Sequence, residues 1–104
     1  MTARQRADAL SDRLAEKRWR NGRLYFRLKQ YDAADYYLRS VIAEYPRSVW
    51  AGEARILLAD VYVRQRKYDE AAATLREVAP SEASPDVKRR AQERLRELEA
   101  RGKS

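Results

Sequence analysis

Residues 31–45 read YDAADYYLRSVIAEY, and residues 68–78 read YDEAAATLREV. The two stretches begin alike, and their starting points lie 37 positions apart. In each of them apolar residues recur every three or four positions, which is the spacing of one face of an α-helix. A helical segment that returns at a fixed interval predicts two units of the same kind packed side by side.

The same offset of 37 residues aligns positions within the two quoted stretches and also two pairs that precede them, Gly22 with Ala59 and Tyr25 with Tyr62. The aligned pairs are Gly22 and Ala59, Tyr25 and Tyr62, Tyr31 and Tyr68, Ala34 and Ala71, and Leu38 and Leu75. Small residues let helix backbones approach closely, and aromatic rings fill the wedges between successive hairpins. We therefore expect the four aligned tyrosines to be buried at equivalent joints.

The remaining sequence is predicted to be helical too. The expected helices span residues 3–29, 32–45, 49–66, 69–79 and 85–100, the first of them either continuous or kinked between Arg18 and Asn21. Thr2 is placed to cap the first helix together with Gln5, and Ser84 followed by a proline marks the start of the last one. No run of alternating β-branched residues predicts a strand, so the fold class is all-α.

This pattern resembles the tetratricopeptide repeat. In that family a small residue is followed by an aromatic residue three positions later and by another in the inter-helix turn, as Gly22, Tyr25 and Tyr31 are here. The resemblance implies antiparallel helical hairpins stacked as a short right-handed solenoid in a single domain. Its expected parts are an N-terminal helix extension (1–14), a first repeat (15–48), a second repeat (49–83) and a C-terminal capping helix (84–101).

A narrower resemblance rests on the YPRS turn at residues 45–48 and on the tyrosine-rich helix before it. These features look like the outer-membrane assembly lipoproteins of the BamD type, with the periplasmic cell-division coordinators of the CpoB type as second choice. The BamD likeness implies a scaffold in outer-membrane protein assembly, located at the periplasmic face of that membrane. If the chain does not share the BamD likeness, its expected location is the cytoplasm. This chain shows neither the signal peptide nor the lipidated cysteine of that lipoprotein family.

The composition of the 104 residues narrows the function further. The chain has no cysteine and no histidine, which excludes disulfides, thiolate and imidazole chemistry and nearly every zinc site. No carboxylate pair or glycine-rich phosphate loop stands out. We therefore predict a protein that is not an enzyme and that uses no metal and no cofactor. No stretch is apolar enough for a membrane span.

The formal net charge of +7 is concentrated at one end of the chain. Residues 1–30 carry nine basic and three acidic side chains, while the other residues are almost balanced. A basic segment attracts phosphate, so a nucleic-acid-binding accessory protein is the alternative function. No helix-turn-helix signature supports that alternative, and acids at positions 8, 12 and 16 interrupt the basic stretch.

The first helices of successive tetratricopeptide repeats line a concave groove that binds partner proteins. The resemblance implies that this groove consists of Trp19, Arg20, Arg23, Phe26 and Arg27 from the first repeat and Ile56, Asp60, Val63 and Arg64 from the second. Arginines beside aromatic rings suit an acidic peptide, through forked hydrogen bonds and stacking. The simpler alternative is a solvated arginine face with aromatic residues that pack on a neighbouring helix. So few repeats also leave open edges through which the chain could self-associate.

Overall fold

A computed structural model describes residues 2–102, so Met1, the first residue of the predicted extension, lies outside the described residues. These residues form five α-helices and no strand, which confirms the all-α prediction. The helices are α1 (Ala3–Arg27), α2 (Tyr31–Glu44), α3 (Val49–Arg64), α4 (Tyr68–Arg76) and α5 (Pro85–Gly102). The first helix is continuous rather than split in two.

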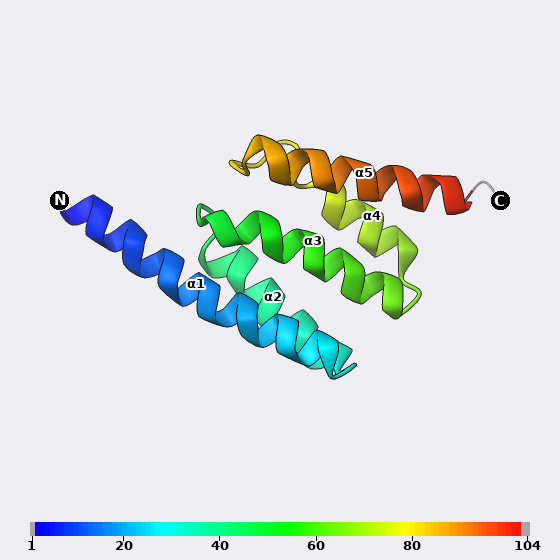
Figure 1. Cartoon of the computed structure of the whole chain (residues 1–104), viewed down its shortest axis with the longest axis horizontal. Helices are drawn as coiled ribbons and strands as arrows, with labels where there is room; N and C mark the ends of the chain where they lie inside the picture. Colours follow the sequence, from blue (N-terminus) through cyan, green and yellow to red (C-terminus); the bar gives the residue numbers. More distant parts are fainter. Residues whose placement is uncertain (1, 103–104) are drawn as a thin grey trace.

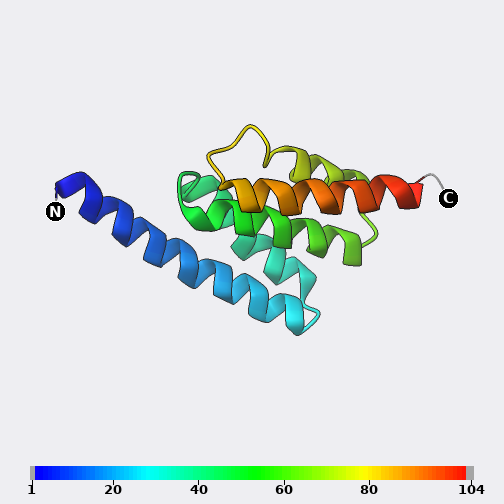
Figure 2. The ribbon, with the colours of Figure 1, turned by 45° about the horizontal axis from the view of Figure 1, so that its top comes forward.

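The helices lie in two layers, with α1, α3 and α5 in front and α2 and α4 behind them in the view of Figure 1. The molecule measures 53 × 29 × 17 Å, and its smallest extent fits two layers of helices. Each hairpin packs one front helix on one rear helix, α1 with α2 and α3 with α4. The last helix packs on α4 and α3, as Figure 2 also shows.

The helix starts follow from the capping residues in the sequence. The Thr2 hydroxyl accepts a hydrogen bond from the Gln5 backbone at 3.2 Å, and the Gln5 side chain accepts one from the Thr2 backbone at 2.8 Å. The Ser48 hydroxyl accepts a bond from the backbone of Trp50, and the Ser84 hydroxyl accepts one from that of Val87. These bonds satisfy backbone donors that the first turn of a helix leaves free.

The two turns that close the hairpins are copies of one another. Lys29 and Arg66, which are 37 residues apart, both adopt the left-handed conformation, with φ of 60° and 61°. The next residue in each turn donates a backbone hydrogen bond five residues back, from Gln30 to Tyr25 and from Lys67 to Tyr62. This is the Schellman arrangement, in which glycine is the preferred residue at the left-handed position. The chain uses a long basic residue there instead.

The core is centred on α3, which contacts all four other helices. Ala54, Val61 and Leu58 of this helix are almost completely buried, together with Leu38 and Val41 of α2. Gly22 lies where α1 crosses α2, and a Cβ atom added to it would come within 2.8 Å of the Leu38 side chain. The predicted close approach of helix backbones at this small residue is confirmed.

The aligned tyrosines are not equally buried. Tyr62 is 5% exposed, and Tyr25 and Tyr31 are half-buried, but Tyr68 is 48% exposed. The prediction that all four fill buried joints is therefore wrong for Tyr68. In the first hairpin Tyr31 packs against Phe26, with ring centroids 5.9 Å apart, whereas Tyr68 borders an open hollow between its hairpin and α5.

Candidate functional site

Two hollows lie on the face formed by α1, α3 and α5. The first, which we name the tryptophan hollow, has a volume of about 450 Å³. Its lining residues are Trp19, Arg20, Arg23, Leu24, Arg27 and Trp50. The two tryptophan rings lie 5.0 Å apart, centroid to centroid, and the Arg23 guanidinium lies 5.6 Å from the centre of the Trp19 ring. Stacking on an aromatic ring holds a guanidinium in place and leaves its N–H edge free to donate.

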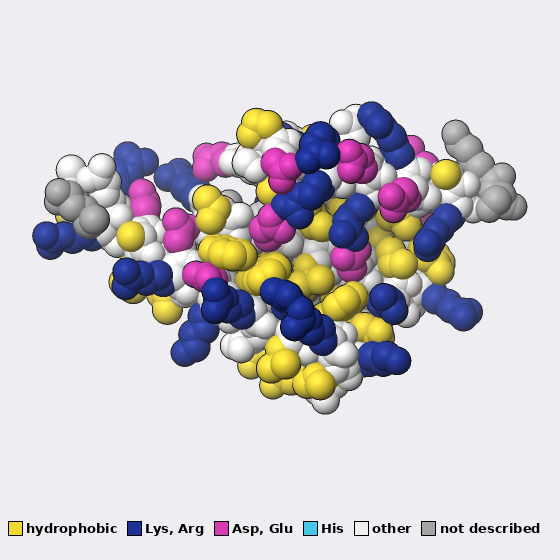
Figure 3. All heavy atoms as spheres, viewed as in Figure 1, with side chains coloured by type: hydrophobic (Ala, Val, Ile, Leu, Met, Phe, Trp, Pro, Cys, Tyr) yellow, Lys and Arg dark blue, Asp and Glu magenta, His cyan; other side chains and the backbone are white. Residues whose placement is uncertain are grey.

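The second hollow, named here the α3–α5 hollow, has a volume of about 600 Å³. Its lining residues are Phe26, Ala59, Asp60, Val63, Arg64, Arg66, Tyr68, Leu75, Arg94, Glu97, Leu98 and Arg101. The Arg64 guanidinium lies 5.6 Å from the centre of the Phe26 ring, which repeats the arginine and aromatic pairing of the tryptophan hollow. Figure 3 shows hydrophobic side chains along the middle of this face, with basic side chains on both sides of them.

The α3–α5 hollow carries a surplus of positive charge. Its four arginines are opposed by two acids, Asp60 and Glu97. Burial raises the pKa of the Asp60 carboxyl group, and the ion pair that this group forms with Arg94 counteracts only part of that effect. The two acids do not neutralise the hollow, so it offers a favourable place for a carboxylate from outside.

The last helix is fixed in place as a wall of this hollow. Arg90 of α5 forms an ion pair with Glu53 of α3, and Arg94 forms the pair with Asp60 one turn further on. Val87 and Ala91 of the same helix are buried. Because the charged pairs and the apolar residues hold the same helix, α5 stands beside α3 much as α3 stands beside α1.

The structure brings eight of the nine predicted groove residues to these two hollows. Trp19, Arg20, Arg23 and Arg27 line the tryptophan hollow, and Phe26, Asp60, Val63 and Arg64 line the α3–α5 hollow. Ile56 is the exception. Its side chain is only 4% exposed and belongs to the hydrophobic core, so it presents no surface to a partner.

Several lining residues were not foreseen. Trp50 completes the tryptophan hollow, and Arg94, Leu98 and Arg101 of α5 form one wall of the α3–α5 hollow. The sequence held a signal for the α5 wall, because the 37-residue interval that relates the two hairpins also leads from Glu53 to Arg90. Adding 37 residues to a position of α3 therefore leads to the equivalent position of a third front helix, α5, where Arg90 faces Glu53.

Comparison with known proteins gives one result. The tetratricopeptide repeat family matches residues 25–95, from the last turn of α1 into α5. No curated protein and no solved structure matches the chain. Among residues 2–102, no helix combines the length and the apolar character that crossing a membrane requires.

Proposed function

Because the chain belongs to the tetratricopeptide repeat family, whose repeats mediate protein–protein interactions, we propose that its front face binds an acidic segment of a partner protein. In this proposal the carboxylates of the partner accept hydrogen bonds from Arg20, Arg23, Arg27 and Arg64. Its apolar side chains lie against the rings of Trp19 and Phe26. The protein acts as a scaffold, without catalysis.

One observation carries this proposal. Arg23 over Trp19 and Arg64 over Phe26 give each hollow a guanidinium that is already held on a ring, at the same distance of 5.6 Å. A guanidinium that is held in place loses less side-chain entropy on binding, and its fork matches a carboxylate. An acidic peptide with apolar residues meets both requirements of such a surface.

The chain contains its own reporter for this binding. Its only two tryptophans, Trp19 and Trp50, lie against each other in the tryptophan hollow. We expect a peptide of alternating glutamate and leucine to change their fluorescence in a saturable way, and the same peptide with glutamine for glutamate to bind at least about tenfold more weakly. Equal binding of the two peptides would exclude carboxylate recognition.

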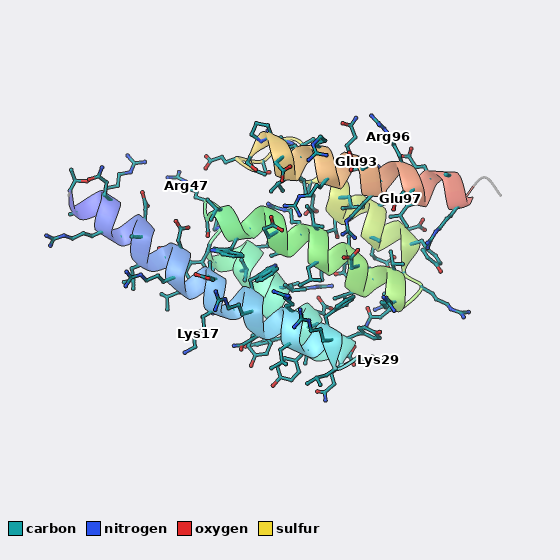
Figure 4. The ribbon with its side chains drawn as sticks, in the orientation of Figure 1. Lys17, Lys29, Arg47, Glu93, Arg96 and Glu97 are labelled. Carbon is teal, nitrogen blue, oxygen red and sulfur yellow. The ribbon has the colours of Figure 1, made fainter. Side chains whose placement is uncertain are left out.

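A pair of arginine variants tests the location. Replacing both Arg23 and Arg27 with glutamine is expected to weaken binding of the acidic peptide about tenfold or more. The matched control replaces Arg47 and Arg96, which removes the same charge at residues that line neither hollow. Arg47 lies by the α2–α3 turn, and Arg96 points away from the fold above α5 (Figure 4). Equal losses in both double variants would mean that only net charge matters.

Nucleic acid is the competing ligand for a basic surface, and the salt dependence of binding and the relative affinity of the wild-type chain distinguish it from an acidic peptide. Binding of duplex DNA by phosphate contacts falls steeply with salt and does not depend on base sequence. If DNA bound the wild-type chain more tightly than the acidic peptide did at physiological salt, the proposed function would be wrong. The alternative, a nucleic-acid-binding accessory protein, would then replace the protein-binding scaffold.

We further propose, from the YPRS turn and the tyrosine-rich helix before it, that the partner belongs to outer-membrane protein assembly and that the chain works at the periplasmic face of that membrane. This proposal rests on the sequence resemblance alone. Fractionation of the native cells tests it: the protein should be recovered with the periplasmic or outer-membrane fraction. Recovery with the cytosol would reject both the location and the assembly role.

A further inference from the structure

The outer side of α1 carries an apolar seam that no other part of the fold covers. Positions that alternate three and four residues apart define it: Ala3, Ala7, Leu10, Leu14, Lys17, Asn21, Leu24 and Leu28. This alternation is the a and d pattern of a coiled coil, continued over more than three heptads. The four leucines are 43–59% exposed, and Figure 4 shows Lys17 pointing away from the body of the fold.

The seam is separate from the face by which α1 packs on its own fold. Ala15 and Gly22, the two buried residues of α1, lie on another side of this helix. Among the described residues seven large hydrophobic side chains are exposed, and four of them belong to this one seam or continue it past the end of α1. None of the seven lies on α5. The stack therefore has one apolar edge, at α1, and one polar edge, at α5.

The order of residue types along the seam is nearly the same in both chain directions. Its pattern is symmetric about position 19: Leu10 mirrors Leu28, Leu14 mirrors Leu24, and Lys17 mirrors Asn21. Two antiparallel copies of this helix can therefore place every leucine opposite a leucine. The same register places each Lys17 ammonium group where it can donate to the Asn21 carboxamide oxygen of the second copy.

We propose that the chain forms a two-fold dimer in which the α1 seams of two copies pair as an antiparallel coiled coil. A parallel pairing would place Lys17 opposite Lys17, which like charge disfavours. In a head-to-tail arrangement, the α1 of one copy would stack on the α5 of another. This arrangement is disfavoured, because it would bury the polar surface of α5 against the leucines of the seam. The antiparallel arrangement is closed, because the same surface is used by both copies.

The charges beside the seam give the dimer a distinctive salt dependence. Arg6, Arg13, Arg20 and Arg27 follow one another at intervals of seven and form one flank of the seam. In the antiparallel dimer Arg13 lies near Arg27 of the second copy, and Arg20 lies near its own equivalent. Salt screens such like charges, so added salt should strengthen the dimer.

Cross-linking tests the register, and the absence of cysteine from the chain makes it specific. A Leu14→Cys chain mixed with a Leu24→Cys chain should yield cross-linked dimers with a short bismaleimide, and Leu14→Cys alone should yield few. Arg96→Cys, outside the seam, measures random collisions. Cross-linking of Leu14→Cys to itself above that level indicates parallel pairing and overturns the arrangement. A mixture that behaves like the Arg96→Cys control overturns it as well.

Light scattering tests the dimer itself. The wild-type chain should show twice the 12.2 kDa mass of one chain at millimolar concentration. Leu14→Gln, which changes a seam leucine that lines neither hollow, should show the single mass with unchanged helical circular dichroism. Val49→Gln is the matched control, because Val49 is an apolar side chain with 70% exposure outside the seam. A wild-type chain that stays monomeric refutes the proposal. So does dissociation on adding salt.

A gain of affinity completes the test. Arg13→Glu converts two like-charge contacts per dimer into opposite-charge contacts and should tighten the dimer about tenfold. Unchanged or weaker association would contradict the proposed register. The seam and the tryptophan hollow share Leu24 and are both bordered by Arg20 and Arg27, but the wild-type chain still distinguishes the two proposals. A chain that binds the acidic peptide and stays monomeric refutes the dimer alone, and a chain that dimerises without binding the peptide refutes the proposed function alone.

Discussion

Gly22→Ala is a substitution for which helix propensity and helix packing predict opposite results. In a helix interior alanine is favoured over glycine by about 1 kcal/mol, so helix propensity alone predicts a more stable protein. In this fold the new Cβ would lie 2.8 Å from both Cγ and Cδ2 of Leu38. Leu38 is completely buried, and overpacking of a core costs about 1–3 kcal/mol.

The contact with Leu38 involves two carbon atoms, so we take the upper half of the overpacking range. After the gain in propensity, Gly22→Ala should lower the free energy of unfolding by about 1–2 kcal/mol. Urea denaturation followed by circular dichroism measures this difference, and the melting temperature should fall by roughly 5–15 °C. Gly102→Ala is the matched control, because a Cβ there meets nothing within 4 Å.

A double-mutant cycle with Leu38→Ala isolates the contact. Removing the leucine side chain leaves room for the new Cβ, so in that background Gly22→Ala should stabilise the chain by about 1 kcal/mol. The coupling between the two sites is then about 2–3 kcal/mol. If Gly22→Ala stabilised the wild-type chain as much as it stabilised the Leu38→Ala chain, α1 and α2 would not approach as closely as the structure has them.

Three further predictions concern the turns, the partly buried Asp60 and the last helix. Lys29→Gly and Arg66→Gly should each stabilise the fold by about 0.5–1 kcal/mol in thermal melts, because glycine adopts the left-handed conformation without strain. Burial is the main cause that raises the pKa of Asp60 in the folded state above its value in the unfolded chain, so the folded state binds the proton more tightly. The contribution of Asp60 to stability therefore becomes less favourable as pH rises from the unfolded pKa to the folded pKa. Asp60→Asn should therefore be at least as stable as the wild type at pH 7, and this advantage should be smaller near pH 4. Arg94→Gln should be less stable than the wild type at pH 7. Urea titrations at the two pH values measure the stability of both variants. Ser84→Ala should cost about 1 kcal/mol, seen as earlier loss of helicity on heating, because it removes the cap of α5.

The sequence predicted the parts of the fold that depend on local pattern. The capping residues Thr2, Ser48 and Ser84 mark helix starts through their own side chains, and the structure forms all three caps. The 37-residue interval predicted the hairpin pairs because equivalent joints need residues of similar size. The family match to residues 25–95 confirms the repeat class that this interval indicated.

The features that sequence missed depend on which neighbour is present. Tyr31 and Tyr68 are equivalent in sequence, yet only Tyr31 packs on an aromatic ring of its own hairpin, since Phe26 aligns with Val63 in the second one. Ile56 shares a helix face with groove residues in the alignment, but the packing of four helices around α3 buries it. The left-handed residues at 29 and 66 carry no glycine signal, so their conformation follows from the hairpin closure alone.

The two proposed surfaces of α1 share arginines, and this makes them thermodynamically linked. Arg20 and Arg27 line the tryptophan hollow and also flank the seam, where the dimer brings like charges together. An acidic peptide bound to these arginines lowers that repulsion, so it should tighten the dimer, and dimerisation should tighten peptide binding by the same factor. Sedimentation at low salt with and without the glutamate–leucine peptide measures the effect. A peptide that binds in the tryptophan hollow and leaves the dimerisation constant unchanged would show that the arginine row does not oppose pairing, and the predicted strengthening by salt would lose its cause.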